Sequence, residues 1–274
     1  MNLVLTGSTS GIGWETLKEM LPLCEVVILP VRNEEKAQKM IGTLSGKEKI
    51  RIVSMDLSIM KSVKKAATEI LKITDRIDVL INNAGGMFPA KKLTEENLDL
   101  TFATNHLGHF LLTKQLLPAL IRGKAKIINL SSEAHRISGN PKPDLSLKKS
   151  ANTVTAYGKV KLYNILFTNE LKIRFESDGI SAYSLHPGAV KTAFGSETSG
   201  LAKAIIRVTQ LLFISAKAGA QTTLFLAKTP KEKLRNGSYY DRKKPKVPSS
   251  AALNQQLAKE LWEYSESVLD DLKI

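Results

Sequence analysis

Tyr157 and Lys161 are the pair of side chains in this sequence best suited to proton chemistry. They lie four residues apart in a segment with helical periodicity, so both side chains project from one face of a helix. A tyrosine with a pKa of about 10 exchanges protons poorly at neutral pH, but a nearby ammonium favours the phenolate and lowers that pKa. We therefore expect Lys161 to prepare Tyr157 for general acid–base chemistry. This spacing is common by chance, so the interpretation depends on the rest of the chain.

A glycine-rich turn near the start of the chain is the second chemical signature. An apolar run over 3–6 leads into Gly7, Gly11 and Gly13, and a helical pattern follows. Such a turn lets backbone N–H groups and a helix N-terminus approach a pyrophosphate, which larger side chains would block. The spacing G-x-x-x-G-x-G at a first strand–helix junction predicts a dinucleotide site. Its expected members are Thr6, Gly7, Ser10, Gly11, Ile12 and Gly13; a glycine turn without a ligand is the alternative.

The end of the second apolar run indicates which dinucleotide is bound. A residue about 20 positions beyond the turn contacts the adenosine ribose in such folds. An aspartate at Val31 would suit the free ribose hydroxyls of NAD, but the chain continues with Arg32 and Asn33. A guanidinium fork suits a 2′-phosphate, so we predict that NADP(H) is preferred over NAD(H). The alternative is that Arg32 only ends a strand.

Short apolar runs alternate with helical patterns through most of the chain, which is typical of a parallel sheet with helical crossovers. Strands are expected at 3–6, 25–29, 51–55, 79–82, 126–130 and 181–185, and helices at 12–21, 34–41, 59–73, 94–120 and 155–176. Beyond them we expect an amphipathic helix over 201–214, a helix over 217–228, a short strand at Tyr239–Tyr240 and a last helix over 250–269. Ser249 or Ser250 is the expected N-cap of that last helix.

Four motifs in order make the chain resemble the short-chain dehydrogenase/reductase family. Thr6–Gly13 matches T-G-x-x-x-G-I-G, Asn82–Gly85 matches N-N-A-G, Tyr157–Lys161 matches Y-x-x-x-K, and Pro187-Gly188 follows the sixth strand. The resemblance spans essentially the whole chain. It implies one Rossmann-type α/β domain over 1–274, with a doubly wound parallel sheet of seven strands in the order 3-2-1-4-5-6-7. Three segments, 131–135, 162–167 and 237–262, are most similar to the retinol dehydrogenase and carbonyl reductase branch.

The resemblance also implies roles for single residues. Ser132, with Ser131 as the fallback, would polarise the substrate oxygen, although a helix cap or turn is the alternative. Asn105 would kink its helix and hold a water that links Lys161 to solvent, unless it is a buried structural amide. Tyr157 is the expected proton donor in reduction, and Lys161 would also hold the nicotinamide ribose. The remaining expected cofactor contacts are Asp56, Leu57, Asn83, Ala84, Gly85, Pro187, Gly188, Val190 and Thr192.

The four histidines show no metal-site spacing, and we expect no metal. His106 and His109 lie three apart on one helix without an evident third ligand, and His135 and His186 stand elsewhere. Packing or capping is the expected role of all four, while His186 is placed to line the nicotinamide pocket because it precedes Pro187.

The charge balance is strongly basic. The chain has 274 residues, 40 lysines and arginines against 26 acidic residues, and a net charge of +14. Such a charge favours anionic partners but does not identify one. Eight basic residues fall between Lys228 and Lys246, where a solvated loop is the simplest interpretation. No aromatic-interleaved basic motif supports nucleic-acid binding. No signal peptide or membrane span is apparent, and the single cysteine, Cys24, fits a reducing cytoplasm.

These inferences together predict an NADP(H)-dependent oxidoreductase that interconverts a hydrophobic aldehyde or ketone and its alcohol. A retinoid, a steroid or a lipid-like carbonyl is the expected kind of substrate, because the segment proposed as a lid, about 193–216, is apolar around Phe194 and 201–214. The same apolar segment is compatible with a homo-oligomer contact or a membrane-surface element. The alternatives are a related epimerase or dehydratase, a non-catalytic NADP(H) sensor or scaffold, and a nucleic-acid binder suggested by charge alone.

Overall fold

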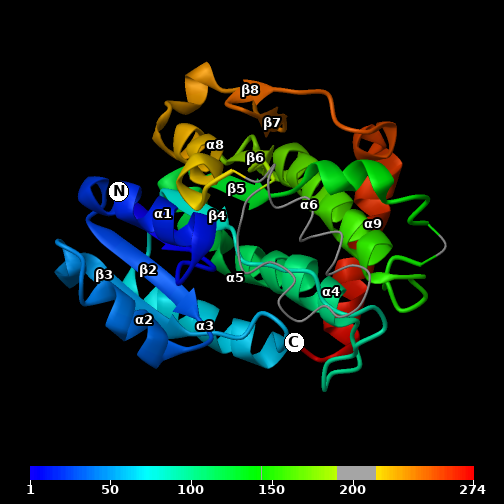
Figure 1. Ribbon diagram of the computed structural model, residues 1–274, viewed down its shortest axis with the longest axis horizontal. Helices are drawn as coiled ribbons and strands as arrows, with labels where there is room; N and C mark the ends of the chain where they lie inside the picture. The colour runs from blue at the N-terminus through cyan, green and yellow to red at the C-terminus, as the bar shows by residue number, and fades with distance from the viewer. Residues whose placement is uncertain (143, 190–213) are drawn as a thin grey trace.

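Strands and helices alternate along the chain and form one sheet covered on both faces (Figure 1). The computed structural model describes residues 1–142, 144–189 and 214–274. The strands are β1 Asn2–Leu5, β2 Val26–Val31, β3 Ile50–Ser54, β4 Val79–Asn82, β5 Lys126–Leu130, β6 Ser181–His186, β7 Tyr239–Asp241 and β8 Lys244–Pro245. The helices are α1 Gly11–Met20, α2 Glu34–Ile41, α3 Met60–Ile73, α4 Leu100–Phe102, α5 Gly108–Gly123, α6 Thr153–Phe175, α8 Ala216–Lys228 and α9 Gln255–Asp271.

The strand order is β3-β2-β1-β4-β5-β6-β7-β8, which confirms the predicted order of the first seven strands. These seven pair in parallel, and β8 adds an antiparallel edge strand that the sequence analysis did not predict. Arg242 and Lys243 join β7 to β8 with φ values of 48° and 66°. Two consecutive residues with positive φ make the two-residue turn that hairpins favour, but this turn usually carries Asn-Gly or Asp-Gly. The usual sequence signal was therefore missing.

Side chains of each central strand alternate between two buried cores. On β1, Leu3 and Leu5 pack with α1, α2 and α8, whereas Val4 packs on the opposite face with α3, α5 and α6. The neighbouring strands repeat this alternation, as expected when both faces of a parallel sheet are covered. Because all these strands run in one direction, their carboxyl ends meet at one edge of the sheet, where the predicted site residues follow them.

The helix predicted over 94–120 begins later and is not uniform. Asp99 accepts hydrogen bonds from the backbone N–H groups of Thr101 and Phe102 and so caps a helix that starts at Leu100. Residues 94–98 instead form a turn in which Asn97 has a φ of 57°. Between α4 and α5 the chain makes a π-helical turn over Ala103–Leu107, which is the break that the resemblance implied around Asn105.

The last helix also differs from its expected bounds. Residues Ser250–Leu253 form a 3-10 turn, and α9 starts at Gln255. Its N-cap is Asn254, whose side chain accepts a hydrogen bond from the backbone N–H of Leu257, so neither Ser249 nor Ser250 caps it. The α9 helix packs on α6, where the ring of Trp262 lies 5.9 Å from that of Phe167.

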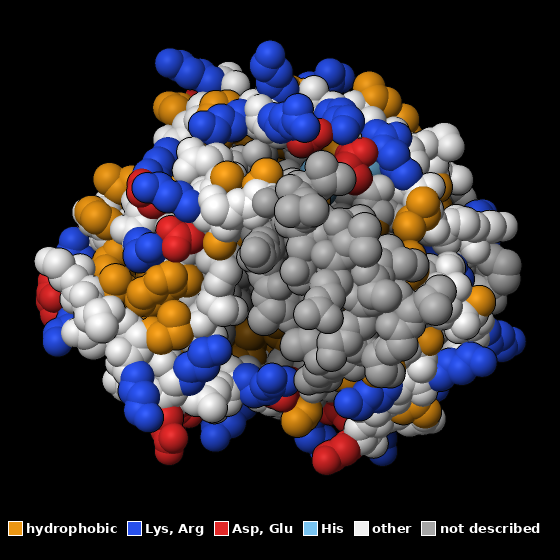
Figure 2. All heavy atoms as spheres, in the orientation of Figure 1, with side chains coloured by type: hydrophobic (Ala, Val, Ile, Leu, Met, Phe, Trp, Pro, Cys, Tyr) orange, Lys and Arg blue, Asp and Glu red, His pale blue; other side chains and the backbone are white. Residues whose placement is uncertain are grey.

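The basic segment over 228–246 lies on the surface around β7 and β8, where Lys and Arg side chains gather along the upper edge in Figure 2. Several of these charges have partners within the protein: Lys246 lies 2.9 Å from Asp241 and 3.2 Å from Glu133. The structure thus favours a solvated, partly neutralised edge. Among the described residues, no helix is long and apolar enough to cross a membrane.

Replacing Trp262 with alanine tests whether α9 belongs to the core. Trp262 is buried and contacts the rings of Phe110, Phe167 and Phe175. We expect Trp262→Ala to lower the free energy of unfolding by about 3–5 kcal/mol in a denaturant titration. Leu253→Ala, at a side chain that is 57% exposed just before α9, should change it by no more than about 0.5 kcal/mol. Similar losses in both variants would contradict this packing.

Candidate functional site

The turn between β1 and α1 is shaped to receive a negatively charged group. Gly7 and Gly11 have φ values of 67° and 53°, which favour glycine. A Cβ on Gly13 would overlap the carbonyl oxygen of Gly7, so the turn closes only with glycine there. Ser10 occupies the N-cap position of α1 but makes no side-chain cap hydrogen bond, and the first helical turn carries no acidic residue. The helix N-terminus is thus left to bind an anion, which fits the pyrophosphate of a dinucleotide.

This turn is held against the loop that follows β4. The hydroxyl of Thr6 accepts hydrogen bonds from the backbone N–H groups of Asn83 and Ala84, each at 3.0 Å. The Asn83 side chain donates to the carbonyl oxygens of Thr6 and Gly7 at 2.8 and 3.1 Å. The Thr6 hydroxyl and the Asn83 amide nitrogen therefore join the two loops.

Arg32 follows β2 at the same edge of the sheet and is exposed. Its neighbour Asn33 caps α2, because its side chain accepts a hydrogen bond from the backbone N–H of Lys36 at 2.8 Å. After β3, Asp56 accepts hydrogen bonds from the backbone and hydroxyl of Ser58, and Leu57 is buried. Asn33, Asp56 and Leu57 thus have structural roles in addition to the predicted cofactor contacts.

Tyr157, Lys161 and Ser132 come together at the carboxyl end of β5. Tyr157 and Lys161 lie one turn apart on α6, with Lys161 Nζ 5.5 Å from the centre of the Tyr157 ring. Ser132 follows β5 and its hydroxyl is hydrogen-bonded to Tyr157; it also caps the short 3-10 helix Glu133–Ile137, at 3.2 Å from the backbone nitrogen of Ala134. Ser131 points away and donates a 2.6 Å hydrogen bond to the carbonyl oxygen of Lys161. The geometry thus favours Ser132 over Ser131 as the serine that meets a substrate.

The pKa of Tyr157 moves in the direction opposite to the one expected. Burial raises the pKa of its phenol above the ordinary value, and the hydrogen bond with Ser132 offsets only part of this effect. Burial also lowers the pKa of Lys161 to about 8. Lys161 Nζ donates to the carbonyl oxygen of Leu130 at 3.0 Å. Desolvation therefore outweighs the ammonium effect that the spacing predicted.

Asn105 lies in the π-helical turn and is fully buried. Its side chain accepts from the backbone N–H of Gly86 at 3.0 Å and donates to the carbonyl oxygens of Gly86 and Thr101, both at 3.1 Å. Gly85 lies between Asn105 and Lys161: a Cβ there would overlap Asn105 Oδ1 and lie 3.7 Å from Lys161 Nζ. The structure brings Asn105 close to the lysine, with its side chain engaged by the loop after β4.

The end of β6 completes this edge of the sheet. Pro187 and Gly188 follow the strand, and Gly188 has a φ of 93°. A Cβ on Gly188 would lie 2.5 Å from Ile214, whose backbone N–H donates to the carbonyl oxygen of Ala189 at 2.8 Å. The predicted contacts Val190 and Thr192, the helix over 201–214 up to residue 213, and most of the proposed lid lie outside the described residues.

The histidines make internal hydrogen bonds. His135 Nδ1 lies 2.6 Å from the carbonyl oxygen of Ser132, and His186 Nδ1 accepts from the backbone N–H of Glu133 at 3.3 Å. The described part of the chain holds no group of three or more metal-binding side chains.

His109 is the residue whose contact with the site the sequence did not predict, because its ring lies 3.0 Å from the Thr6 hydroxyl. Its spacing of four from Asn105 was the available signal.

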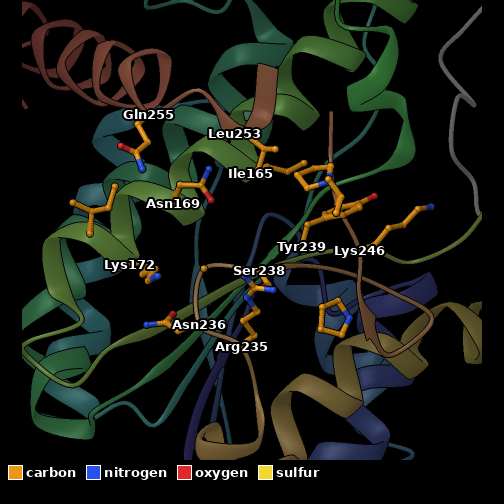
Figure 3. Close-up of a pocket in the computed structure, with 15 residues that line it drawn as sticks. Ile165, Asn169, Lys172, Arg235, Asn236, Ser238, Tyr239, Lys246, Leu253 and Gln255 are labelled. Carbon is orange, nitrogen blue, oxygen red and sulfur yellow. The ribbon is translucent and has the colours of Figure 1, made fainter. Parts of the chain in front are cut away.

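A cavity of about 520 Å³ lies elsewhere, between α6, the β7–β8 hairpin and the segment before α9 (Figure 3). Lys172, Asn169 and Leu253 are among its lining residues. It contains none of the four predicted catalytic residues, so we do not assign the chemistry to it.

Comparisons with known proteins agree with the family resemblance and with the fold. A family model of short chain dehydrogenases matches residues 2–200. Retinol dehydrogenase 13 of Mus musculus is 34% identical over 270 residues, covering 95% of this chain and 81% of that protein. Retinol dehydrogenase 14 of Homo sapiens is 32% identical over 292 residues, covering 99% and 87%. The solved NADPH-bound carbonyl reductase from chicken fatty liver has the same fold, with a TM-score of 0.68, 23% identity and coverage of 90% and 98%. The chain belongs to the short-chain dehydrogenase family.

Proposed function

We propose that this protein is an NADP(H)-dependent oxidoreductase that interconverts a hydrophobic aldehyde or ketone and the corresponding alcohol. The observation that carries the proposal is the meeting of Ser132, Tyr157 and Lys161 at the carboxyl edge of the sheet, beside a glycine turn shaped for a pyrophosphate. Family membership supports an oxidoreductase of carbonyl and alcohol groups in general. The cofactor preference and the substrate class are the finer parts of the proposal.

The chemistry divides between the cofactor and the chain. A bound nicotinamide dinucleotide supplies or accepts the hydride at the substrate carbon. In reduction, the phenol of Tyr157 gives its proton to the carbonyl oxygen, while the hydroxyl of Ser132 donates a hydrogen bond to that oxygen and stabilises developing negative charge. The raised pKa of Tyr157 keeps it protonated for this role. In oxidation the same groups act in reverse.

Lys161 and Asn105 support the proton transfer. Lys161 stands one helical turn from Tyr157, and its positive charge favours the phenolate that remains after the proton has left. Asn105 lies across Gly85 from Lys161 Nζ and holds the backbone of Gly86. Lys161 can pass a proton to the Tyr157 phenolate. We assign to Asn105 the placement of the loop beside Lys161, where a water can then restore the proton of Lys161.

The NADP(H) preference rests on Arg32. It is exposed at the end of β2, where the ribose of the adenosine lies in this type of fold, and α2 begins two residues later. Its guanidinium can bind a 2′-phosphate with two parallel hydrogen bonds. Val31, at the position where an aspartate would bind free ribose hydroxyls, is apolar and buried.

The substrate class rests on the apolar side chains near the reactive edge and on the relatives. Val154 lies three residues before Tyr157 on the same face of α6 and is 44% exposed. Met87 and Phe88 follow Gly85 and Gly86 on the loop after β4. The curated relatives named retinol dehydrogenases suggest an apolar substrate for this chain as well. The second candidate function, a non-catalytic NADP(H) sensor, would use the same glycine turn without Tyr157 chemistry.

Tyr157→Phe tests the catalytic assignment. The variant keeps the buried ring and removes the proton donor, so we expect turnover of aldehydes or ketones by NADPH to fall about a hundredfold or more, with little change in NADPH affinity. Ser132→Ala should also lose activity. Ser131→Ala is the matched control, because its hydroxyl contacts only the Lys161 carbonyl in this site; it should cost about 1 kcal/mol of stability and keep most activity. The non-catalytic sensor would be favoured if the wild-type protein binds NADPH and Tyr157→Phe leaves its properties unchanged.

Arg32→Ala tests the cofactor preference. Calorimetry should show that the wild-type protein binds NADPH more tightly than NADH. The variant should weaken NADPH binding roughly tenfold to a hundredfold and leave NADH binding nearly unchanged, because it removes a charge-assisted hydrogen-bond donor. Lys72→Ala removes the same charge at the far end of α3 and is the control for general electrostatics. Equal effects on both cofactors, or tighter NADH binding by the wild-type protein, would reject the role of Arg32.

The pH profile tests Lys161. Carbonyl reduction needs a protonated Tyr157 and a charged Lys161, and kcat/KM reports the groups of the free enzyme. Because burial lowers the pKa of Lys161 to about 8, kcat/KM for reduction should be level through neutral pH and fall as the pH rises through that value. A profile that stays level well above pH about 9 would contradict a role for the Lys161 charge.

A further inference from the structure

His109 occupies a position where three parts of the site meet. It is the second residue of α5, directly after the π-helical turn, and is buried. Its Nε2 lies 3.0 Å from the hydroxyl of Thr6, at the end of β1. Its Nδ1 lies 3.4 Å from the carbonyl oxygen of Asn105. One imidazole ring therefore spans the glycine turn and the Asn105 segment.

The hydrogen bonds of Thr6 determine which nitrogen of His109 carries the proton. The Thr6 oxygen already accepts from two backbone N–H groups, those of Asn83 and Ala84, which fills its two lone pairs. Its single proton can go to His109 Nε2 at 3.0 Å or to the carbonyl oxygen of Ile81 at 3.4 Å. The shorter contact favours His109 Nε2 as the acceptor. On the other side, the carbonyl oxygen of Asn105 can only accept, so His109 Nδ1 must donate. A neutral ring that donates from Nδ1 has a bare Nε2, so the Asn105 side assigns the proton to Nδ1 and the shorter Thr6 contact agrees with that assignment.

The hydrogen bonds form a closed circuit around the site. The loop after β4 binds Thr6 through Asn83 and Ala84, and it binds the Asn105 side chain through Gly86. His109 closes the circuit by joining Thr6 to the Asn105 backbone. We propose that His109 is a positioning residue, with its one proton on Nδ1, that sets the distance between the cofactor-binding glycine turn and the Asn105–Lys161 region.

A charged imidazolium could not serve in this position. It would present a second N–H to Thr6 in place of the acceptor, and Lys161 is the nearby cation that would repel it. Burial, the main cause, lowers the pKa of His109 to about 3, with Lys161 and the hydrogen bond to Asn105 acting in opposite directions. His109 therefore stays neutral through the range in which an ordinary histidine titrates.

His106 is an internal control provided by the chain. It lies one turn earlier, is equally buried, and burial also lowers its pKa to about 3. Its Nε2, however, lies 3.0 Å from the hydroxyl of Ser265 in α9. That hydroxyl donates to the carbonyl oxygen of Leu261 at 2.7 Å, so His106 must donate from Nε2. The two histidines thus carry opposite tautomers, and only His109 contacts the site.

The tautomer is tested by ¹⁵N NMR of the wild-type protein, in which His106→Leu and His109→Leu assign the signals among four histidines. We expect His109 to show a protonated Nδ1 and a bare Nε2, His106 to show the reverse, and neither to titrate between pH about 5 and 8. A proton on Nε2 of His109, or titration of His109 in that range, would overturn the proposal. This measurement does not depend on the proposed function.

The positioning role rests on the proposed NADP(H) function and is tested by graded variants. His109→Gln places an oxygen where Nε2 accepts from Thr6, and His109→Asn places an amide N–H where Nδ1 donates to Asn105. His109→Leu provides neither. We expect NADPH affinity to fall about tenfold or more in His109→Leu and less in the two amide variants, because each retains one hydrogen bond. His106→Leu should lower the melting temperature but change NADPH affinity by less than about twofold.

Three results separate the possible failures. Equal losses of NADPH affinity in His106→Leu and His109→Leu at equal losses of stability would reduce His109 to a packing residue. If His109→Leu does not fold, the Gln and Asn variants carry the same comparison, and NADPH affinity equal to wild type in both would reject the proposal. If the wild-type protein binds neither NADPH nor NADH, the proposed function fails, while the NMR measurement still decides the tautomer.

Discussion

The contact between the glycine turn after β1 and the loop after β4 is the constraint on which the rest of the site depends. A Cβ on Gly7 would lie 2.8 Å from the Cα of Ala84, and the Asn83 side chain bonds the carbonyl oxygens of Thr6 and Gly7. The two loops can therefore approach only because Gly7 lacks a side chain. The same contact places the N-terminus of α1, the proposed pyrophosphate site.

The parallel sheet makes this contact possible and extends it. β1 pairs with β4, β4 with β5 and β5 with β6, so the loops that follow them stand in a row along one edge. The glycine turn, the loop after β4, Ser132 and Pro187 each follow a different strand. Two separate cores, one on each face, hold the strands in register. The site residues are held in fixed positions because they follow strands whose side chains are buried on both faces.

Burial shifts the pKa values of the reactive groups. Tyr157 and Lys161 lie deep enough that desolvation raises the pKa of the phenol and lowers that of the ammonium, which keeps a proton on Tyr157 and makes Lys161 easier to deprotonate. The same effect keeps His109 neutral between Thr6 and Asn105. Spacing along a helix predicts which groups meet, whereas their proton affinities depend on how much water the fold excludes.

The order of the strands was implied by the family resemblance. The local sequence by itself determined the places of the first six strands, the place of the glycine turn and the pairing of Tyr157 with Lys161. These follow from local rules: apolar runs mark strands, glycines permit positive φ, and four residues make a helical turn.

The tertiary structure decided the features that depend on partners far away in the chain. Ser132 faces Tyr157 while Ser131 turns to the α6 backbone, the helix expected from 94 is cut short by the Asp99 cap, and an Arg-Lys turn adds β8. His109 gains its place only when Thr6, 103 residues away, folds onto it. Hydrogen bonds between distant segments leave no periodic signal in the sequence, which is why packing alone could reveal them.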